Sequence, residues 1–72
     1  MSKRNQLLYK FWLAGIQNDN HEFTRLYIEG AGKVGYEAAK KAWRAGWQDA
    51  QNGITMQSNL GQLWDSRRGK DV

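Results

Sequence analysis

The sequence contains no cysteine and no proline, and it has one histidine among its 72 residues. Without cysteine the chain has neither a disulfide framework nor a thiolate metal site, and nothing points to an oxidising compartment. The absence of proline is compatible with a mostly helical chain. A domain of this length buries only about 60% of its unfolded surface, so its fold depends on a small apolar core.

Long apolar runs are also missing. No stretch reaches about 18 apolar residues, so we expect no transmembrane helix and no contact with a membrane. The N-terminal segment MSKRNQLLYKFWLAGIQ has the basic start and apolar middle of a signal peptide, but Lys10 interrupts the apolar part. We therefore expect no cleaved signal and a cytoplasmic protein.

Residues for catalysis are scarce. His21 is the single histidine, and no cysteine or evident arrangement of acid and nucleophile accompanies it. The acidic residues are scattered along the chain and are explained as helix caps or surface pairs, such as Glu37 with Lys41. We expect that the protein is not an enzyme and has no catalytic residue and no metal site.

Three glycines, Gly30, Gly32 and Gly35, form the GxGxxG pattern of dinucleotide-binding proteins. That pattern works only where it follows a strand of a parallel sheet, with a crossover of about 30 residues. This chain has no room for such a sheet. We interpret the glycines as a tight turn between two helices, with Gly35 already in the second helix, and expect no cofactor.

The longest uninterrupted helical pattern runs from Lys33 to Asn52. Aromatic and small residues share its predicted inner side: Tyr36, Ala39, Trp43, Trp47 and Ala50. Beside them lies what we call the small-residue strip: Gly35, Ala38, Ala42 and Gly46. Such a strip allows a second helix to approach to backbone contact, either within the chain or in a homodimer. Asp49 lies near the strip and is expected to bond a tryptophan N–H or an arginine.

Two shorter helices are predicted before this central one. The first spans Ser2 to Gln17, with Ser2 as its cap and apolar residues at spacings of three and four. The second runs from Asn20 to about Glu29, capped by Asp19 with Glu22 at the third helical position. A strand over FTRLYI is the alternative, because that segment is rich in aromatic and β-branched residues.

After the central helix, Asn52 and Gly53 form a predicted stop. Residues 54–57 are expected to cross back over the core, and Ser58 to cap a last short helix that carries Leu60, Leu63 and Trp64. Residues from about 67 to 72 are expected to be a frayed basic tail. The whole chain, 1–72, is thus predicted to be one all-α domain, a small bundle of three to four helices around one long amphipathic helix.

Lysine and arginine number 11 against 7 acidic residues, which gives a formal charge of +4. This balance favours a polyanionic partner, most often nucleic acid. Four basic residues share the outer side of the central helix, and those near the termini join them if both ends fold to that side. The predicted nucleic-acid-binding residues are Lys33, Lys40, Lys41, Arg44, Lys3, Arg4, Arg67 and Arg68. An ordinary solvated helix face explains the same pattern equally well.

The chain is rich in aromatic residues, with four Trp, three Tyr and two Phe. In so small a domain this predicts that some rings are exposed, where they act as anchors for a protein or as stacking platforms for bases. The alternative is that all four tryptophans belong to the core. The predicted partner-binding residues are Trp12, Tyr36, Trp43, Trp47 and Trp64.

The segment Trp43 to Ala50, WRAGWQDA, resembles the WxxGWx[D/E]A signature of the ribosome modulation factor family. GYEA, starting at Gly35, resembles the GYxA of the first helix of that family, and the similarity covers about a quarter of the chain. The matching positions are Trp43, Gly46, Trp47, Asp49 and Ala50, with Gly35, Tyr36 and Ala38 as weaker matches. The linker that separates the two motifs in the family is absent here. The resemblance implies a small basic helical protein that docks on ribosomal RNA and silences ribosomes.

Two functions are therefore expected as alternatives. The first is a regulatory, non-enzymatic module that binds RNA or a ribonucleoprotein such as the ribosome through its basic helix face, with exposed tryptophans adding stacking. The second is a small inhibitor or adaptor of the phage or plasmid type, which grips a partner protein through a tryptophan-rich surface.

Overall fold

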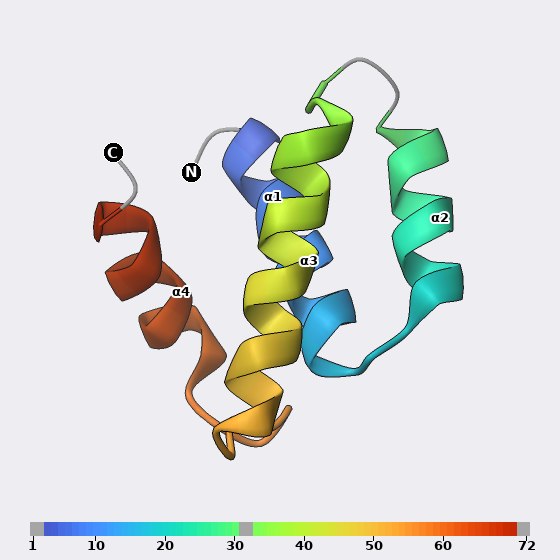
Figure 1. Cartoon of the computed structure of the whole chain (residues 1–72). Helices are drawn as coiled ribbons and strands as arrows, with labels where there is room; N and C mark the ends of the chain where they lie inside the picture. Colours follow the sequence, from blue (N-terminus) through green and yellow to red (C-terminus); the bar gives the residue numbers. More distant parts are fainter. Residues whose placement is uncertain (1–2, 31–32, 71–72) are drawn as a thin grey trace.

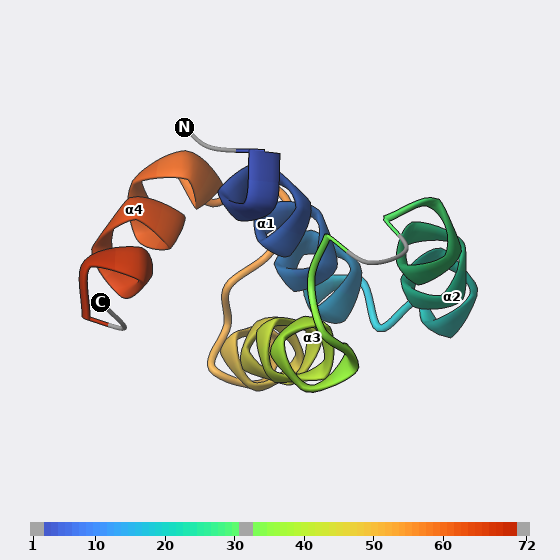
Figure 2. The ribbon, with the colours of Figure 1, turned by 90° about the horizontal axis from the view of Figure 1, so that it is seen from above.

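Four helices make up the described part of the chain. The computed structural model describes residues 3–30 and 33–70, the last four as backbone only. In order the helices are α1 (Lys3–Ile16), α2 (Asn20–Glu29), α3 (Tyr36–Gln51) and α4 (Leu60–Lys70), and these ranges contain no strand. α1 and α3 cross at the centre, with α2 and α4 on opposite sides (Figures 1 and 2). The predicted all-α bundle is confirmed, as is the helix, rather than a strand, at residues 20–29.

α1 and α3 touch backbone to backbone through two glycines. A Cβ on Gly15 of α1 would lie 1.9 Å from the carbonyl oxygen of Trp43, and a Cβ on Gly46 of α3 would lie 2.0 Å from that of Trp12. No side chain larger than hydrogen fits at either point. The close helix approach predicted from the small-residue strip is confirmed at Gly46, and the helix that approaches is α1.

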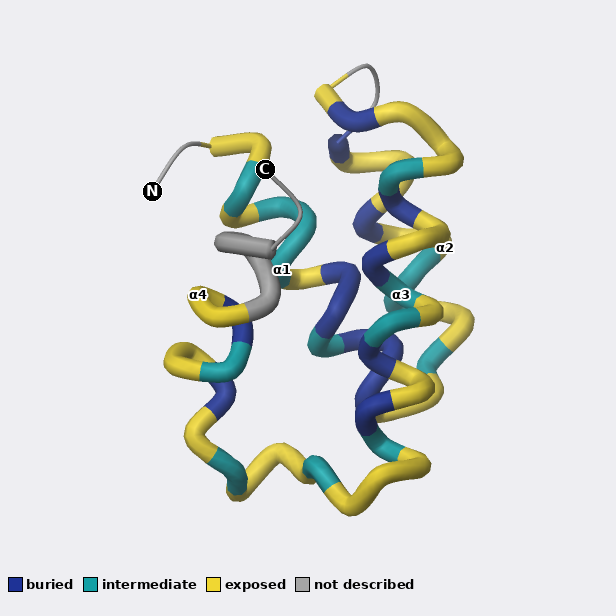
Figure 3. Tube along the Cα trace, turned by 60° about the vertical axis from the view of Figure 1, so that its left-hand side comes forward, coloured by how far each residue is buried: buried dark blue, intermediate teal, exposed yellow. Residues whose placement is uncertain are grey.

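Two apolar clusters share α1 between them. The α2-side cluster contains buried residues of α1, α2, α3 and the segment before α3: Phe11, Ala14, Leu26, Val34, Ala39 and Ala42. The α4-side cluster is formed by Trp12, Ile16, Leu60 and Trp64. Figure 3 shows the buried stretches of α1 and α3 meeting in the middle of the molecule. α1 is thus the element on which both sides of the bundle depend.

A buried hydrogen bond ties α1 to α3 beside the glycine contact. The indole Nε1 of Trp12 donates to Oδ2 of Asp49 at 2.8 Å. Asp49 is the one charged side chain in the core of the described residues. A buried carboxylate needs such donors to offset its lost hydration, and the predicted bond from a tryptophan N–H to Asp49 is confirmed.

α3 begins at Tyr36 rather than at the predicted Lys33. Gly35 is its N-cap, with φ −70° and ψ 158°, and a Cβ there would meet nothing within 4 Å. The prediction that Gly35 belongs to the small-residue strip is therefore wrong. The glycines before α3 disfavour helix, and Val34 is buried in the α2-side cluster, which holds this segment outside the helix. At the other end Asn52 caps α3 and Gly53 has φ +93°, which confirms the predicted stop.

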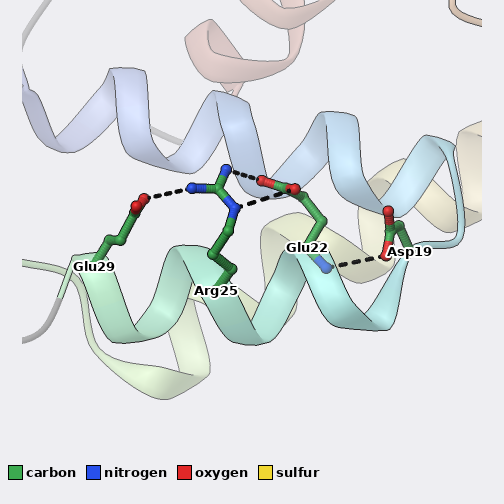
Figure 4. A network of polar contacts seen from close by, with 4 residues as sticks. All are labelled: Asp19, Glu22, Arg25 and Glu29. Atoms are coloured by element: carbon green, nitrogen blue, oxygen red, sulfur yellow. Dashed lines mark hydrogen bonds and ion pairs between the residues drawn. The ribbon is translucent and has the colours of Figure 1, made fainter.

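Asp19 caps α2 as predicted, but Glu22 does not form the reciprocal hydrogen bond of a capping box. Oδ1 of Asp19 accepts a hydrogen bond from the backbone N–H of Glu22 at 3.0 Å. The N–H of Asp19 donates to the carbonyl oxygen of Ala14 at 3.0 Å, so it does not receive the side chain of Glu22. The carboxylate of Glu22 instead pairs with Arg25 (Figure 4).

α4 differs from the prediction at both ends. Asn59, not Ser58, caps it: Oδ1 of Asn59 accepts from the N–H of Gln62 at 3.4 Å, while the Ser58 hydroxyl accepts from the N–H of Thr55. The helix continues to Lys70, further than the short helix predicted, and the frayed basic tail at 67–72 stays a prediction, with residues 71–72 outside the described residues. In the preceding segment only Ile54 packs on the core, and residues 55–57 are exposed. The predicted Ser2 cap of α1 lies outside the described residues.

Candidate nucleic-acid interface

The predicted inner side of α3 is correct for Ala39, which is buried, and in part for Trp43 and Ala50, which are half-buried and pack on the core, but wrong for Tyr36 and Trp47. The buried residues of α3 are Ala39, Ala42, Gly46 and Asp49. Tyr36 is 50% exposed and Trp47 is 41% exposed. The physical reason is the backbone contact with α1, which leaves no room for rings between the two helices. Trp43 therefore packs partly against the α2-side cluster, and Tyr36 and Trp47 are exposed.

Three basic residues of α3 face solvent together. Lys40, Lys41 and Arg44 are exposed and line one open hollow of about 550 Å³ on the surface of α3. We call these three residues the basic face. Tyr36, Glu37, Ala45 and Gln48 complete the lining of the hollow. The predicted outward direction of these three cations is confirmed.

Among the described side chains, none of the three cations of the basic face forms an ion pair, although Glu37 lines the same hollow. Within the side chains described, the ion pairs join Arg25 to Glu22 and to Glu29, and the predicted pair of Glu37 with Lys41 is not formed. The nearest partner found for Lys40 is aromatic: its Nζ lies 5.6 Å from the centroid of the Tyr36 ring. The three charges thus remain available to an external anion.

α2 provides the contrast. Arg25 is held between two carboxylates of its own helix, with Nη1 donating to Glu29 at 2.8 Å (Figure 4). The hydrogen bond to Glu22, followed by the charges of Glu22 and Glu29, raises the pKa of Arg25 above its ordinary value. This guanidinium is occupied, so α2 offers no free cation comparable with those of α3.

Lys3 and Lys33, also predicted to bind nucleic acid, do not line this hollow. Lys3 and Lys33 line a second hollow, of about 330 Å³, together with Lys10 and with residues of α1 and α2. None of these lysines lines the hollow on α3. The predicted single surface is therefore split, because Lys33 precedes the helix. Arg4 is exposed on α1, whereas the side chains of Arg67 and Arg68 lie outside the described residues.

Aromatic side chains of α2 and α3 adjoin the basic face. The ring of Tyr36 makes edge contacts with Tyr27 and Phe23, at centroid distances of 5.6 and 6.2 Å. Phe23 also meets Trp43, at 6.1 Å. Phe23, Tyr36, Trp43 and Lys40 line a groove of about 230 Å³ between the two helices. The prediction of partner-binding residues left out Phe23 and Tyr27, although their i, i+4 spacing on a predicted helix indicates a shared face.

Two of the five predicted partner-binding residues are in the core. Trp12 is fully buried and Trp64 is 6% exposed, and their rings pack at 5.6 Å from each other. Neither can anchor a partner on the surface, so this part of the prediction is wrong. Trp43 is half-buried, whereas Tyr36 and Trp47 are exposed. Of the two expectations for the tryptophans, partial exposure is the correct one.

The small-residue strip is occupied within the chain. Ala42 and Gly46 are buried, with Gly46 against the backbone of α1. A homodimer through Gly35, Ala38, Ala42 and Gly46 would require α1 to leave. Gly46 is therefore not accessible to a second copy while α1 is in place, whereas Gly35 is exposed and Ala38 half-buried, and a homodimer stays a prediction.

Comparisons with known proteins give no indication of the function. No protein-family model, curated protein or solved structure matches the chain. The resemblance to ribosome modulation factor stays a hypothesis. Two of its matching positions have a structural role here, because Gly46 allows the contact with α1 and Asp49 accepts the bond from Trp12.

The described part of the chain contains neither a metal site nor a membrane-spanning helix. Across residues 3–30 and 33–66 no three His, Asp or Glu side chains gather closely enough to hold a metal ion. None of the described helices has the length and apolar character needed to cross a bilayer. His21 is exposed near the start of α2.

Proposed function

We propose that this protein binds RNA or a ribonucleoprotein through the basic face of α3. The supporting observation is that Lys40, Lys41 and Arg44 are exposed on one helix and have no acidic partner among the described side chains. Lys40 and Arg44 are about one turn, roughly 6 Å, apart along the helix, which suits adjacent phosphates of one strand. Neutralising phosphates releases condensed counterions, and this release supplies the affinity.

The ribosome is the ribonucleoprotein that the sequence resemblance favours. Docking there would make the protein a regulator of translation without any catalytic step. The proposal places the affinity on α3, while Lys3, Arg4 and Lys33 stay predictions for a secondary contact. The contributions of the two groups to binding can be measured separately, because Lys40, Lys41 and Arg44 line one hollow and Lys3 and Lys33 line another.

The test is the salt dependence of binding to a labelled 20-nucleotide single-stranded RNA, followed by fluorescence anisotropy between 50 and 200 mM salt. The variant Lys40→Gln/Lys41→Gln/Arg44→Gln should bind more weakly. Its plot of log K against log salt should be flatter by about 2, since each phosphate of a single strand that is no longer neutralised reduces the slope by about 0.7.

The matched control is Lys3→Gln/Lys10→Gln/Lys33→Gln, which removes the same charge from the other hollow. This control should retain most of the affinity and of the slope. Binding that does not change with salt would refute contact with a polyanion. Equal losses in the two triple variants would show that net charge, rather than the basic face of α3, determines the binding.

A protein partner is the second candidate, favoured by exposed apolar side chains on α2 and α3. Ile28 is 68% exposed, and Tyr27, Tyr36 and Trp47 are also exposed. An adaptor would be captured from a lysate together with one partner that persists after ribonuclease treatment. Trp47→Ala should abolish that capture, and the Lys40/Lys41/Arg44 variant should leave it intact. Loss of all captured material after ribonuclease would count against the adaptor.

A further inference from the structure

Two aromatic rings flank the cations of α3 along one line. Tyr36, Lys40, Arg44 and Trp47 follow one another at spacings of four, four and three residues, and such positions lie above one another on one side of an α-helix. We call these residues the aromatic–cationic row. α3 is uninterrupted from Tyr36 to Gln51 (Figure 1), so the row is straight. Its two ends are rings and its middle is positive.

Both rings of the row are exposed, and the ring of Tyr36 is also supported by neighbouring rings. Tyr36 is fixed by its edge contacts with Tyr27 and Phe23. The backbone of Trp47 lies at the contact with α1, where a Cβ on Gly15 would come within 3.0 Å of the Trp47 nitrogen. Among the described residues the Trp47 ring packs on no other aromatic ring. The ring contacts of Tyr36 lower the conformational entropy that its side chain loses when a ligand stacks on it, and the helical backbone fixes where the Trp47 side chain begins.

A duplex can contact the cations of this row but cannot stack its bases on the two rings. In a double helix the base faces are stacked on each other, and a protein reaches the phosphates and groove edges only. In a single strand the bases are free to stack on aromatic side chains while the phosphates meet lysine and arginine. An alternation of ring, cation, cation and ring therefore matches a single strand in charge and in shape.

We infer that the aromatic–cationic row binds single-stranded nucleic acid, with one base stacked on Tyr36, another on Trp47, and the intervening phosphates at Lys40 and Arg44. This inference rests on the proposed function and specifies its substrate class. The two rings are eleven residues apart, about 17 Å along the helix. Stacked nucleotides rise about 3.4 Å each, so a strand of roughly five or six nucleotides spans the row and a dinucleotide does not.

The experiment separates stacking from charge by changing Trp47 alone. Trp47→Ala should weaken binding of a ten-nucleotide RNA about five-fold to a hundred-fold, the range for losing one stacked base. The slope of log K against log salt should stay unchanged, since no cation is removed. Trp47→Phe should retain most of the affinity, whereas Trp47→Leu should behave like Trp47→Ala, because leucine is apolar but has no π face. Tyr36→Ala should act in the same direction.

Two controls accompany these variants. Ile28→Ala, which removes an exposed apolar side chain from α2, should leave binding unchanged. A duplex of the same sequence should bind more weakly than the single strand and should not respond to Trp47→Ala. Urea unfolding of each variant confirms that the helices remain folded.

The outcomes distinguish this inference from the proposed function. If the basic-face variant loses affinity while Trp47→Ala and Tyr36→Ala bind like the unchanged protein, RNA binding stands and stacking is refuted. If Trp47→Leu binds like the unchanged protein, apolar area rather than stacking is responsible, and the inference is overturned. Equal binding of duplex and single strand overturns it as well. Absence of any salt-dependent RNA binding refutes both proposals together.

Discussion

Two glycines set the distance between the central helices. Gly15 and Gly46 each face a backbone carbonyl of the opposite helix, at distances that no Cβ can occupy. The backbone of Trp47 lies at this contact, and its ring is exposed. Two residues without side chains thus fix how closely α3 packs on α1.

Gly46→Ala should lower the free energy of unfolding by about 1–3 kcal/mol, the usual cost of overpacking, because the new Cβ would collide with the carbonyl of Trp12. Gly61→Ala is the matched control. Gly61 lies in the first turn of α4, and a Cβ there meets nothing within 4 Å. Its alanine variant should gain up to about 1 kcal/mol from helix propensity. Urea unfolding followed by circular dichroism measures both, and a neutral Gly46→Ala would contradict the close contact.

α2 is the helix whose stability depends most on local interactions. Leu26 is its one buried residue, with Phe23 packed partly against the α2-side cluster. Its remaining support is local: the Asp19 cap and the exposed pairs of Arg25 with Glu22 and Glu29 (Figure 4). Exposed ion pairs of this kind contribute little, so the cap is the larger local contribution.

Asp19→Ala should therefore lower the free energy of unfolding by about 1 kcal/mol, within the range of 0.5–2 kcal/mol found for the removal of caps. The substitution leaves the N–H of Glu22 without its acceptor. Asp19→Asn keeps an acceptor oxygen and should cost clearly less. Thermal unfolding of the two variants side by side measures the difference. Equal losses would mean that the carboxylate charge, rather than the hydrogen bond, stabilises the start of α2.

The molecule as a whole has two apolar clusters that meet at α1. Its core is thin, in keeping with Cα extents of 31 × 26 × 17 Å. α4 is attached through Leu60 and Trp64, which pack on Trp12 and Ile16 of α1. The indole N–H of Trp12 also donates to Asp49 of α3. Trp12 therefore links the two halves of the bundle.

Trp64→Ala should release α4 while leaving α1 to α3 folded. Truncating a buried tryptophan costs about 3–5 kcal/mol, and the loss falls on the α4-side cluster. Native-state hydrogen exchange should show reduced protection at residues 60–66 and retained protection in α1 and α3. Met56→Ala, at an exposed position before α4, should change neither. Uniform loss of protection would show that both clusters unfold as one unit.

Local chemistry made several features predictable from the sequence. Helical spacing indicated the four helices, and the pair Asp19 and Glu22 indicated the start of α2. Small residues at spacings of three and four indicated a close helix contact, and Asp49 beside them indicated a hydrogen bond to a tryptophan. The helical spacing and the cap depend on residues a few positions apart, small residues permit a close approach by any neighbouring helix, and a buried polar group has few ways to be satisfied. The outward direction of Lys40, Lys41 and Arg44 follows from the same amphipathic pattern.

Residues distant in sequence decided the rest. Trp12, Trp43, Trp47 and Trp64 look alike in a helical pattern, yet two are core, one is half-buried and one is exposed. Which of them reaches solvent depends on how α1 and α3 meet, with Gly15 against the backbone of Trp43 and Gly46 against that of Trp12, contacts between residues far apart in the sequence. The split of the basic residues into two hollows likewise follows from Val34 packing against the core before α3 begins. Helix periodicity assigns a side chain to a face, but only packing against other helices determines which face is covered.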